Sequence, residues 1–277
     1  MKVIVAEPRG FCAGVTRAVH LAEQSLQSGK RVYSLGPLIH NPQVVERLYK
    51  QGLTVTDTLD DIPDGAAVLI RSHGEAPRIF LEAKRRGLEV IDGTCVLVKR
   101  AQNIVKQLRE QGYQVLIVGD SNHPEVRGVM AYAPDALCLS DQSDLQKIAG
   151  HPRLGIIAQT TYSLTAFGRM VGLVVASGCD EVKVLDTICQ ATHARQQAAL
   201  EVTKQVQVMF VLGGRRSANT SRLAELCAAH GVDTYHLESW QQFREKYIRG
   251  KTIAGVTAGA STPDWATEEF VRNLRKK

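Results

Sequence analysis

Short continuous apolar runs alternate along the chain with longer stretches in which apolar residues recur every three or four positions. The short runs predict strands at Val3–Ala6, Arg31–Leu35, Ala67–Ile70, Glu89–Ile91, Gln114–Val118, Leu154–Ala158, Glu181–Leu185, Gln207–Leu212, Thr234–Leu237 and Thr252–Val256. The longer stretches predict helices, among them Thr16–Gln27, Pro42–Gln51, Pro77–Arg86, Val96–Glu110, His193–Gln205 and Ser221–His230. Apolar strands separated by helices are typical of parallel sheets covered on both faces, so we expect an α/β fold.

Small, polar or metal-binding residues follow nine of these predicted strands. Examples are "RGFCAG" after the first strand, "GPLIHN" after the second and "RSHG" after the third. In open α/β sheets, ligands bind beyond the carboxyl ends of the strands. Because nine strand ends are followed by such residues, we expect several sheets whose carboxyl ends face one shared site.

Three cysteines divide the chain into similar parts. Cys12, Cys95 and Cys189 each follow an apolar run, and they are 83 and 94 residues apart. One third of a 277-residue chain holds three or four strands with their helices. We therefore expect three small α/β lobes with mainly parallel sheets in a pseudo-threefold arrangement, each contributing one cysteine. Their expected bounds are residues 13–95, residues 96–188, and residues 1–12 together with 189–277.

The composition is that of an ordinary globular protein, with 44% hydrophobic and 22% charged residues. The formal net charge of +6 is dispersed and aromatic residues make up only 5%, which favours a small anionic substrate over nucleic acid. No signal peptide or membrane-spanning stretch is predicted, so we expect a cytoplasmic protein. Its six cysteines should then be reduced and available for metal binding or catalysis. The oligomeric state stays open.

The three dividing cysteines lie in strand-to-helix turns, where a helix N-terminus stabilises a thiolate. Three converging thiolates would bind a soft metal or an iron–sulfur cluster, and a [4Fe–4S] cluster with three cysteine ligands keeps one iron open. Taken singly, each could equally be a small buried residue under a turn. The remaining cysteines lack this context: Cys138 and Cys227 are predicted to lie in the core and Cys179 in a turn.

Polar side chains at other strand ends are suited to hold an anionic substrate, because imidazoles, hydroxyls and amides donate hydrogen bonds to phosphate. These candidates are His40, His73, His123, Ser217, Asn219 and Ser261. Glu125 is a candidate proton donor, and Thr160 is a candidate for orienting a substrate hydroxyl. Taken alone, each of the six anion-binding candidates is also explained by helix capping or exposure to solvent, Glu125 by interaction with a helix dipole, and Thr160 by capping of a strand end.

No recognisable nucleotide loop accompanies these groups, because "GFCAG" lacks the lysine and the following hydroxyl residue of a Walker A motif. The residues together predict a redox metalloenzyme that acts on a small phosphorylated substrate. A zinc-dependent hydrolase and a non-catalytic cluster sensor are alternatives.

Nine motifs in a fixed order make the sequence resemble one enzyme family. They are "RGFCAGV" (9–15), "HNPQVV" (40–45), "SHG" (72–74), "DGTC" (92–95), "HPEV" (123–126), "QTT" (159–161), "TICQAT" (187–192), "SANTSRLAEL" (217–226) and "GVTAGASTPD" (255–264). Together they resemble the 4-hydroxy-3-methylbut-2-enyl diphosphate reductase family of the non-mevalonate isoprenoid pathway, over almost the whole chain.

The resemblance implies one [4Fe–4S] cluster per chain at the centre of the three lobes, with Cys12, Cys95 and Cys189 as its ligands. It implies that the six phosphate-binding candidates hold the diphosphate, that Thr160 positions the substrate hydroxyl, and that Glu125 delivers protons. The implied reaction removes an allylic hydroxyl as water and forms isopentenyl and dimethylallyl diphosphate. Electrons would come from ferredoxin or flavodoxin, since the chain carries no flavin or nicotinamide fingerprint.

Four positions depart from the usual pattern of that family. Val96 stands where proline is usual, Gly93 where alanine is usual, Glu75 where an apolar residue is usual, and Ala218 where many members have serine or glycine. None of these changes removes a predicted cluster ligand or the acid. A divergent paralogue that reduces another phosphorylated alcohol is therefore a further alternative.

Overall fold

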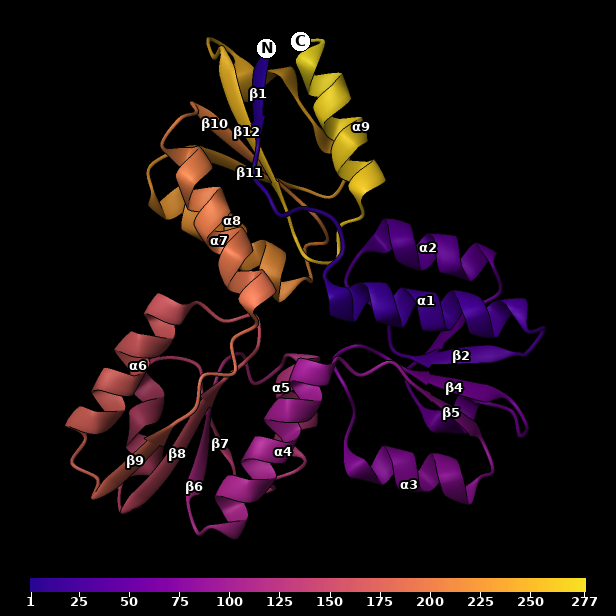
Figure 1. The fold of residues 1–277 in the computed structure, drawn as a ribbon, viewed down its shortest axis with the longest axis vertical. Helices are drawn as coiled ribbons and strands as arrows, with labels where there is room; N and C mark the ends of the chain where they lie inside the picture. Colours follow the sequence, from indigo (N-terminus) through magenta and orange to yellow (C-terminus); the bar gives the residue numbers. More distant parts are fainter. The chain divides into compact units, whose positions relative to one another are not determined.

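The computed structural model describes residues 1–277 and contains three four-stranded sheets in which every strand pairing is parallel (Figure 1). Helices alternate with the strands along the chain. The predicted α/β fold of three parallel-sheet lobes is therefore confirmed.

The first sheet has the strand order β3-β2-β4-β5. Its strands are β2 (Val32–Leu35), β3 (Thr54–Thr56), β4 (Ala67–Ile70) and β5 (Glu89–Asp92). The helices of this part of the chain are α1 (Ala13–Gln27), α2 (Pro42–Lys50) and α3 (Pro77–Arg85). Every residue of β4 is buried, and its alternate residues Val68 and Ile70 pack with Ala83 of α3. The central strand is thus apolar throughout because both of its faces are covered.

The second sheet has the strand order β7-β6-β8-β9. Its strands are β6 (Gln114–Val118), β7 (Leu137–Leu139), β8 (Arg153–Ala158) and β9 (Glu181–Val184), and its helices are α4 (Val96–Glu110), α5 (Pro124–Met130) and α6 (Leu164–Ala176). Val115 and Ile117 of β6 pack with α4 and α5, whereas Leu116 and Val118 pack with α6. Because successive side chains point to opposite faces of the sheet, β6 contributes residues to two separate hydrophobic cores.

The third sheet has the strand order β1-β12-β10-β11. Its strands are β1 (Lys2–Val5), β10 (Val208–Leu212), β11 (Asp233–Leu237) and β12 (Ile253–Ala258), and its helices are α7 (Gln190–Thr203), α8 (Ala218–Ala229) and α9 (Asp264–Arg275). Phe210 of β10 packs with α9 on one face, whereas Met209 and Val211 pack with α7 and α8 on the other. The first and last strands of the chain are neighbours in this sheet (Figure 1).

All three sheets have the same topology. Counted in chain order within each sheet, the strands lie in the order second, first, third, fourth, and in the third sheet the N-terminal strand β1 takes the fourth place. The direction of winding reverses between the first and third strands of each set. Ligands of open α/β sheets bind at such a reversal, beyond the carboxyl ends of the strands.

The chain divides into two compact units. The terminal unit comprises Met1–Thr16, Ile39–Leu48 and Gln190–Lys277 and holds the third sheet; the central unit comprises Arg17–Leu38 and Tyr49–Cys189 and holds the other two. Each sheet draws its strands from one of the three predicted lobe ranges. The exact lobe boundaries stay a prediction.

The structure differs from the predicted elements at two short strands and three helix starts. The sequence pattern missed β3 and β7, because an edge strand of three residues is too short for a periodic signal. Helices α1, α7 and α8 begin three residues earlier than predicted, in mostly small or polar residues that add little to the apolar period. No helix is long and apolar enough to cross a lipid bilayer.

Candidate active site

Each of the three predicted cluster ligands lies between the fourth strand of a sheet and the helix that follows it. Cys12 precedes α1, Cys95 precedes α4 and Cys189 precedes α7. The backbone N–H of each cysteine donates to a carbonyl just beyond the neighbouring third strand: Cys12 to Ala260 (3.0 Å), Cys95 to Ser72 (3.0 Å) and Cys189 to Thr160 (2.8 Å). The same hydrogen bond therefore fixes all three thiols at equivalent places in the repeated topology.

The chemistry of this donor set fits a thiolate-bound group. All three cysteines lie outside disulfide bonds and are partly exposed, and each stands at the N-terminus of a helix of 14 or 15 residues. The partial positive charge of a helix N-terminus favours the thiolate, which is the form that binds iron or another soft metal. Cys138 and Cys227 are buried as predicted, and burial raises the pKa of the Cys227 thiol to about 12.

Glu125 is an acid held inside the second lobe. It lies in the first turn of α5 and is only 3% exposed. One carboxylate oxygen accepts the backbone N–H of Thr160 at 2.6 Å, and the other accepts the Thr160 hydroxyl at 2.7 Å. Burial raises the pKa of Glu125, and the two hydrogen bonds from Thr160 oppose this only in part. The carboxyl group therefore keeps its proton to a higher pH than an ordinary glutamic acid does.

His123 is a neutral imidazole with a defined tautomer. It caps α5, and its Nδ1 accepts the backbone N–H of Glu125 at 3.2 Å. Burial lowers the pKa of His123 to about 4, aided by the nearby Arg71 cation and opposed by Asp120. Since Nδ1 accepts, the ring proton lies on Nε2, which can donate to a ligand.

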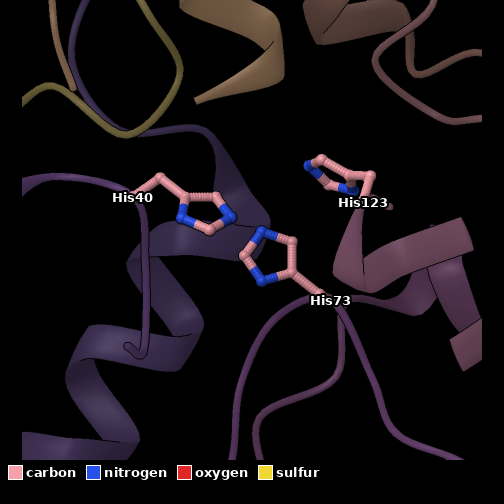
Figure 2. Close-up of side chains that lie close together, drawn as sticks. All are labelled: His40, His73 and His123. Carbon is pink, nitrogen blue, oxygen red and sulfur yellow. The ribbon is translucent and has the colours of Figure 1, made fainter. Parts of the chain in front are cut away.

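His73 lies beside His123 in the central unit. The two ring centroids are 5.4 Å apart and the rings meet edge to face; Figure 2 shows both, together with His40, which belongs to the terminal unit. His73 lies in the turn after β4, and Gly74 follows with a φ of +73°. A Cβ at Gly74 would lie 2.7 Å from the Gln102 side chain, so this turn requires glycine. The structure thus brings two predicted phosphate-binding imidazoles together.

An ion pair spans the turn that carries His73. Arg71 donates from Nη2 and Nε to one carboxylate oxygen of Glu75, at 2.7 and 3.1 Å, and both side chains are less than one fifth exposed. The Arg71 guanidinium also fills the space that a side chain at Gly36 would need. The departure at Glu75 therefore neutralises a cation beside the imidazoles instead of leaving a free anion there.

Four predicted substrate-binding residues, His40, Ser217, Asn219 and Ser261, belong to the terminal unit. The Ser261 hydroxyl donates to the His40 carbonyl at 3.5 Å, and a Cβ at Gly214 would lie only 2.1 Å from the same oxygen. Ser217 caps α8, and the buried Asn219 follows in its first turn. Neither the oxygen nor the nitrogen of the Asn219 side-chain amide has a hydrogen-bond partner in the protein. A buried amide without a partner in the protein is suited to form hydrogen bonds with a polar ligand.

Arg195 holds the loop that carries Cys12. It lies on α7, is 3% exposed, and donates from Nη2 to the Gly10 carbonyl at 2.8 Å and from Nη1 to the Ala191 carbonyl at 3.2 Å. Sequence reasoning missed both Arg195 and Arg71, because arginine is common on exposed helix faces and in loops. No sequence pattern marks Arg195, because the burial of its neighbours Gln196 and Ala199 on α7 is visible only in the structure.

The three parallel-sheet lobes carry thiols, imidazoles and a buried acid at their strand ends. This arrangement places the protein in the class of α/β enzymes. A model of the family described as "LytB protein" matches residues 3–275. The chain belongs to the LytB protein family, which confirms the resemblance drawn from its nine motifs.

Relatives and solved structures agree with this assignment. The chain is 42% identical to 4-hydroxy-3-methylbut-2-enyl diphosphate reductase of Geotalea uraniireducens and 41% identical to that of Geobacter metallireducens, over its whole length and 98% of each relative. A solved diphosphate reductase from Plasmodium falciparum superposes with a TM-score of 0.95 at 28% identity, covering 99% of this chain and 87% of that one. A second solved structure, described as the terminal enzyme of the non-mevalonate pathway, gives a TM-score of 0.73 at 40% identity with both chains fully covered.

Proposed function

We propose that this chain reduces 4-hydroxy-3-methylbut-2-enyl diphosphate to isopentenyl and dimethylallyl diphosphate. The step takes up two electrons and two protons, breaks the allylic C–O bond and releases the hydroxyl as water. Full-length similarity to proteins named for this reaction supports the assignment. The observation that carries it is the buried Glu125–Thr160 pair, because breaking a C–O bond requires a proton for the departing oxygen.

We further propose that Cys12, Cys95 and Cys189 hold one [4Fe–4S] cluster per chain. When bound, such a cluster supplies electrons one at a time and, with only three protein ligands, has one iron open to substrate. The protein's part is to present three thiolates at helix N-termini, each tied by the same backbone hydrogen bond. A pseudo-threefold arrangement of the lobes around this cluster is part of the proposal.

The diphosphate is bound by donors from all three lobes. His123 offers Nε2–H as a neutral donor, and His73 and His40 add imidazoles. Ser217, Asn219 and Ser261 add a hydroxyl, an amide and a second hydroxyl near the N-terminus of α8. Neutral donors of fixed geometry bind an oxyanion without the cost of burying several cations together.

Thr160 orients the acid and Glu125 donates the proton. The two hydrogen bonds from one residue hold both oxygens of the carboxyl group, so its remaining lone pairs and proton point in a fixed direction. We propose that the Thr160 hydroxyl also contacts the substrate hydroxyl. The chain would act in the cytoplasm with ferredoxin or flavodoxin as its electron donor.

Anaerobic purification followed by metal analysis and turnover tests this function. We expect broad absorbance near roughly 400 nm, iron with inorganic sulfide, and conversion of the diphosphate substrate with a reduced dye. Cys12→Ser, Cys95→Ser and Cys189→Ser should each lose most of the iron. Cys179→Ser is the matched control, because Cys179 is partly exposed but lies between α6 and β9.

Glu125→Gln should retain the iron and bind substrate, yet lose at least about 100-fold in turnover. A colourless, zinc-loaded protein would overturn the cluster. A cluster-bearing protein that turns over only another phosphorylated alcohol would establish the paralogue instead.

A further inference from the structure

A solvent-exposed apolar residue is adjacent in sequence to one proposed cluster ligand. Val96 is the first residue of α4, directly after Cys95, and it is 66% exposed. It takes no part in the buried cluster formed by Val98, Ala101 and Val105 further along the same helix. Burial in this protein therefore does not explain a β-branched apolar residue at this position.

Cations surround Val96. Arg17 donates from its guanidinium to the carbonyls of Thr94 (3.2 Å) and Asp92 (3.0 Å), the residues that lead into Cys95. Lys99 and Arg100 follow Val96 by three and four positions on α4, so they lie on the same side of the helix. We call Arg17, Val96, Lys99 and Arg100 the Val96 patch.

Asp92, an acidic residue beside the Val96 patch, does not neutralise all of its positive charge. The Asp92 carboxylate pairs with Lys99 at 2.5 Å. Burial acts to raise the pKa of Asp92, but hydrogen bonds from Lys99 and Thr94 outweigh it and lower the pKa. Asp92 thus stays ionised and offsets Lys99, so it does not offset the positive charges of Arg17 and Arg100 in the patch.

We propose that the Val96 patch is the docking surface for the external electron donor, an acidic one-electron carrier protein. The inference rests on the proposed function, in which each turnover consumes two electrons that this chain cannot supply. Two reduced donor molecules would dock in turn, each giving up one electron and leaving oxidised, while the protons come from Glu125 and solvent.

The composition and place of the patch fit that role. An apolar centre with a charged rim is the ordinary anatomy of a protein–protein interface. Positive charge on the rim steers an acidic partner to the surface and raises its association rate. Contact at Val96 would bring the carrier to the residue covalently joined to Cys95, which keeps the path between the two redox groups short.

Charge reversal at Arg100 tests the proposal, with an acidic [2Fe–2S] ferredoxin as the probe. Arg100→Glu should weaken ferredoxin binding by about tenfold at low salt, and the effect should shrink as salt is raised. The ferredoxin-driven rate should fall by a similar factor, whereas the rate driven by a small reduced viologen dye should not change. Lys84→Glu on α3 is the matched control, because it alters net charge equally at another exposed position of the central unit.

Val96→Glu provides a second test that leaves Arg100 in place and should weaken ferredoxin binding in the same direction. Equal ferredoxin affinity in Arg100→Glu, Lys84→Glu and the unmodified chain would overturn the docking surface, as would self-association of the chain that Arg100→Glu abolishes. Failure of the unmodified chain to convert substrate with the dye would instead overturn the proposed function. Binding measured directly, by titration at several salt concentrations, separates these outcomes from any change in cluster chemistry.

Discussion

Thr160 donates hydrogen bonds to both oxygens of the Glu125 carboxyl group, one from its backbone N–H and one from its hydroxyl. The same residue's carbonyl accepts the backbone N–H of Cys189. One strand end therefore connects the buried acid to a proposed cluster ligand. This arrangement makes Thr160 a positioning residue whose removal should affect the acid before it affects the fold.

Thr160→Val should lower turnover and shift its pH dependence. Burial already raises the pKa of Glu125, and loss of the hydroxyl removes one of the two hydrogen bonds that hold it down. Activity that needs protonated Glu125 falls as pH rises through this pKa, so the alkaline limb of the variant should move to higher pH. We expect at least about a tenfold loss of turnover at neutral pH from the misoriented acid.

Thr160→Ser is the control, because serine retains the hydroxyl as well as the backbone N–H. Its pH–rate profile with a reduced dye as electron source should lie close to that of the unmodified chain. Identical profiles for the serine and valine variants would show that the hydroxyl does not tune Glu125.

His123 should make stability depend on pH in a defined window. Its pKa is about 4 in the folded chain and near 6.5 when unfolded, so below pH 6.5 the unfolded chain binds the extra proton. The contribution of His123 to the free energy of unfolding therefore increases as the pH rises from about 4 to about 6.5. Between pH 5 and 7 the gain is about 2 kcal/mol.

His123→Asn should remove that gain while keeping an acceptor at the N-cap of α5. Chemical denaturation of both proteins at pH 5 and pH 7, at equal cluster content, measures the difference. Glu125 contributes a slope of opposite sign, since its pKa is raised on folding, but that slope is present in both proteins. An unchanged difference between the two pH values would contradict a neutral His123.

Apolar patterning predicted much of the fold because the inner strands are buried on both faces. The predicted bounds of β4 and β6 match the structure residue for residue, and these strands lie inside their sheets. The pattern fails at β3 and β7, where three residues at a sheet edge carry too little periodic signal. Cysteine spacing predicted three lobes and placed residues 1–12 with the third, whereas the repeated strand order, with β1 beside β12, became visible only in the structure.

The candidate site was predicted as a set of residue types, but not the contacts that tune them. Glu125, Thr160 and His123 were named from motifs, yet their hydrogen bonds depend on how α5 meets the end of β8. The partner of Glu75 could not be predicted from the sequence pattern either, because whether Arg71 contacts the residue four positions later depends on the turn at Gly74. Such contacts are set by loop geometry, which local sequence determines weakly.

Glu75→Gln should tighten the binding of inorganic pyrophosphate. Glutamine keeps an oxygen that can accept from Arg71 but removes the negative charge, so one uncompensated cation is left near His123. We expect a Kd lower by about threefold to tenfold at low salt, with a smaller effect at high salt. Calorimetric titration measures it, with Glu82→Gln as the control for an equal change in net charge at the Glu82–Arg85 pair of α3. Equal affinities for the two variants would contradict a role for the Arg71–Glu75 pair in anion binding.

Val96→Pro should stabilise the chain. Proline is well accepted at the first position of a helix, where its missing N–H has no partner within the helix. The preceding residue must be extended, and Cys95 already has φ −59° and ψ 139°. We expect a gain of about 0.5–1 kcal/mol in the free energy of unfolding from the restricted unfolded chain. Asn103→Pro, inside the same helix, should instead cost about 3 kcal/mol, and a loss from Val96→Pro comparable to that would contradict the geometry at Cys95.

Arg195→Met should loosen the loop that carries Cys12. The substitution keeps much of the side-chain volume but removes both donors, which leaves the Gly10 carbonyl without its buried guanidinium partner two residues before the thiol. Hydrogen bonds from a charged group contribute about 1.5–3 kcal/mol, so the fraction of time in which Cys12 is displaced should rise at least about tenfold. If Cys12 binds the proposed cluster, iron should pass to a chelator faster by a similar factor. Arg195→Lys, which keeps the charge and one donor, should restore part of the retention. Arg222→Met on α8 is the control in the same unit, where the arginine pairs with Glu225 nearer the surface. Equal rates of iron loss from the Arg195 and Arg222 methionine variants would show that Arg195 supports α7 without holding Cys12.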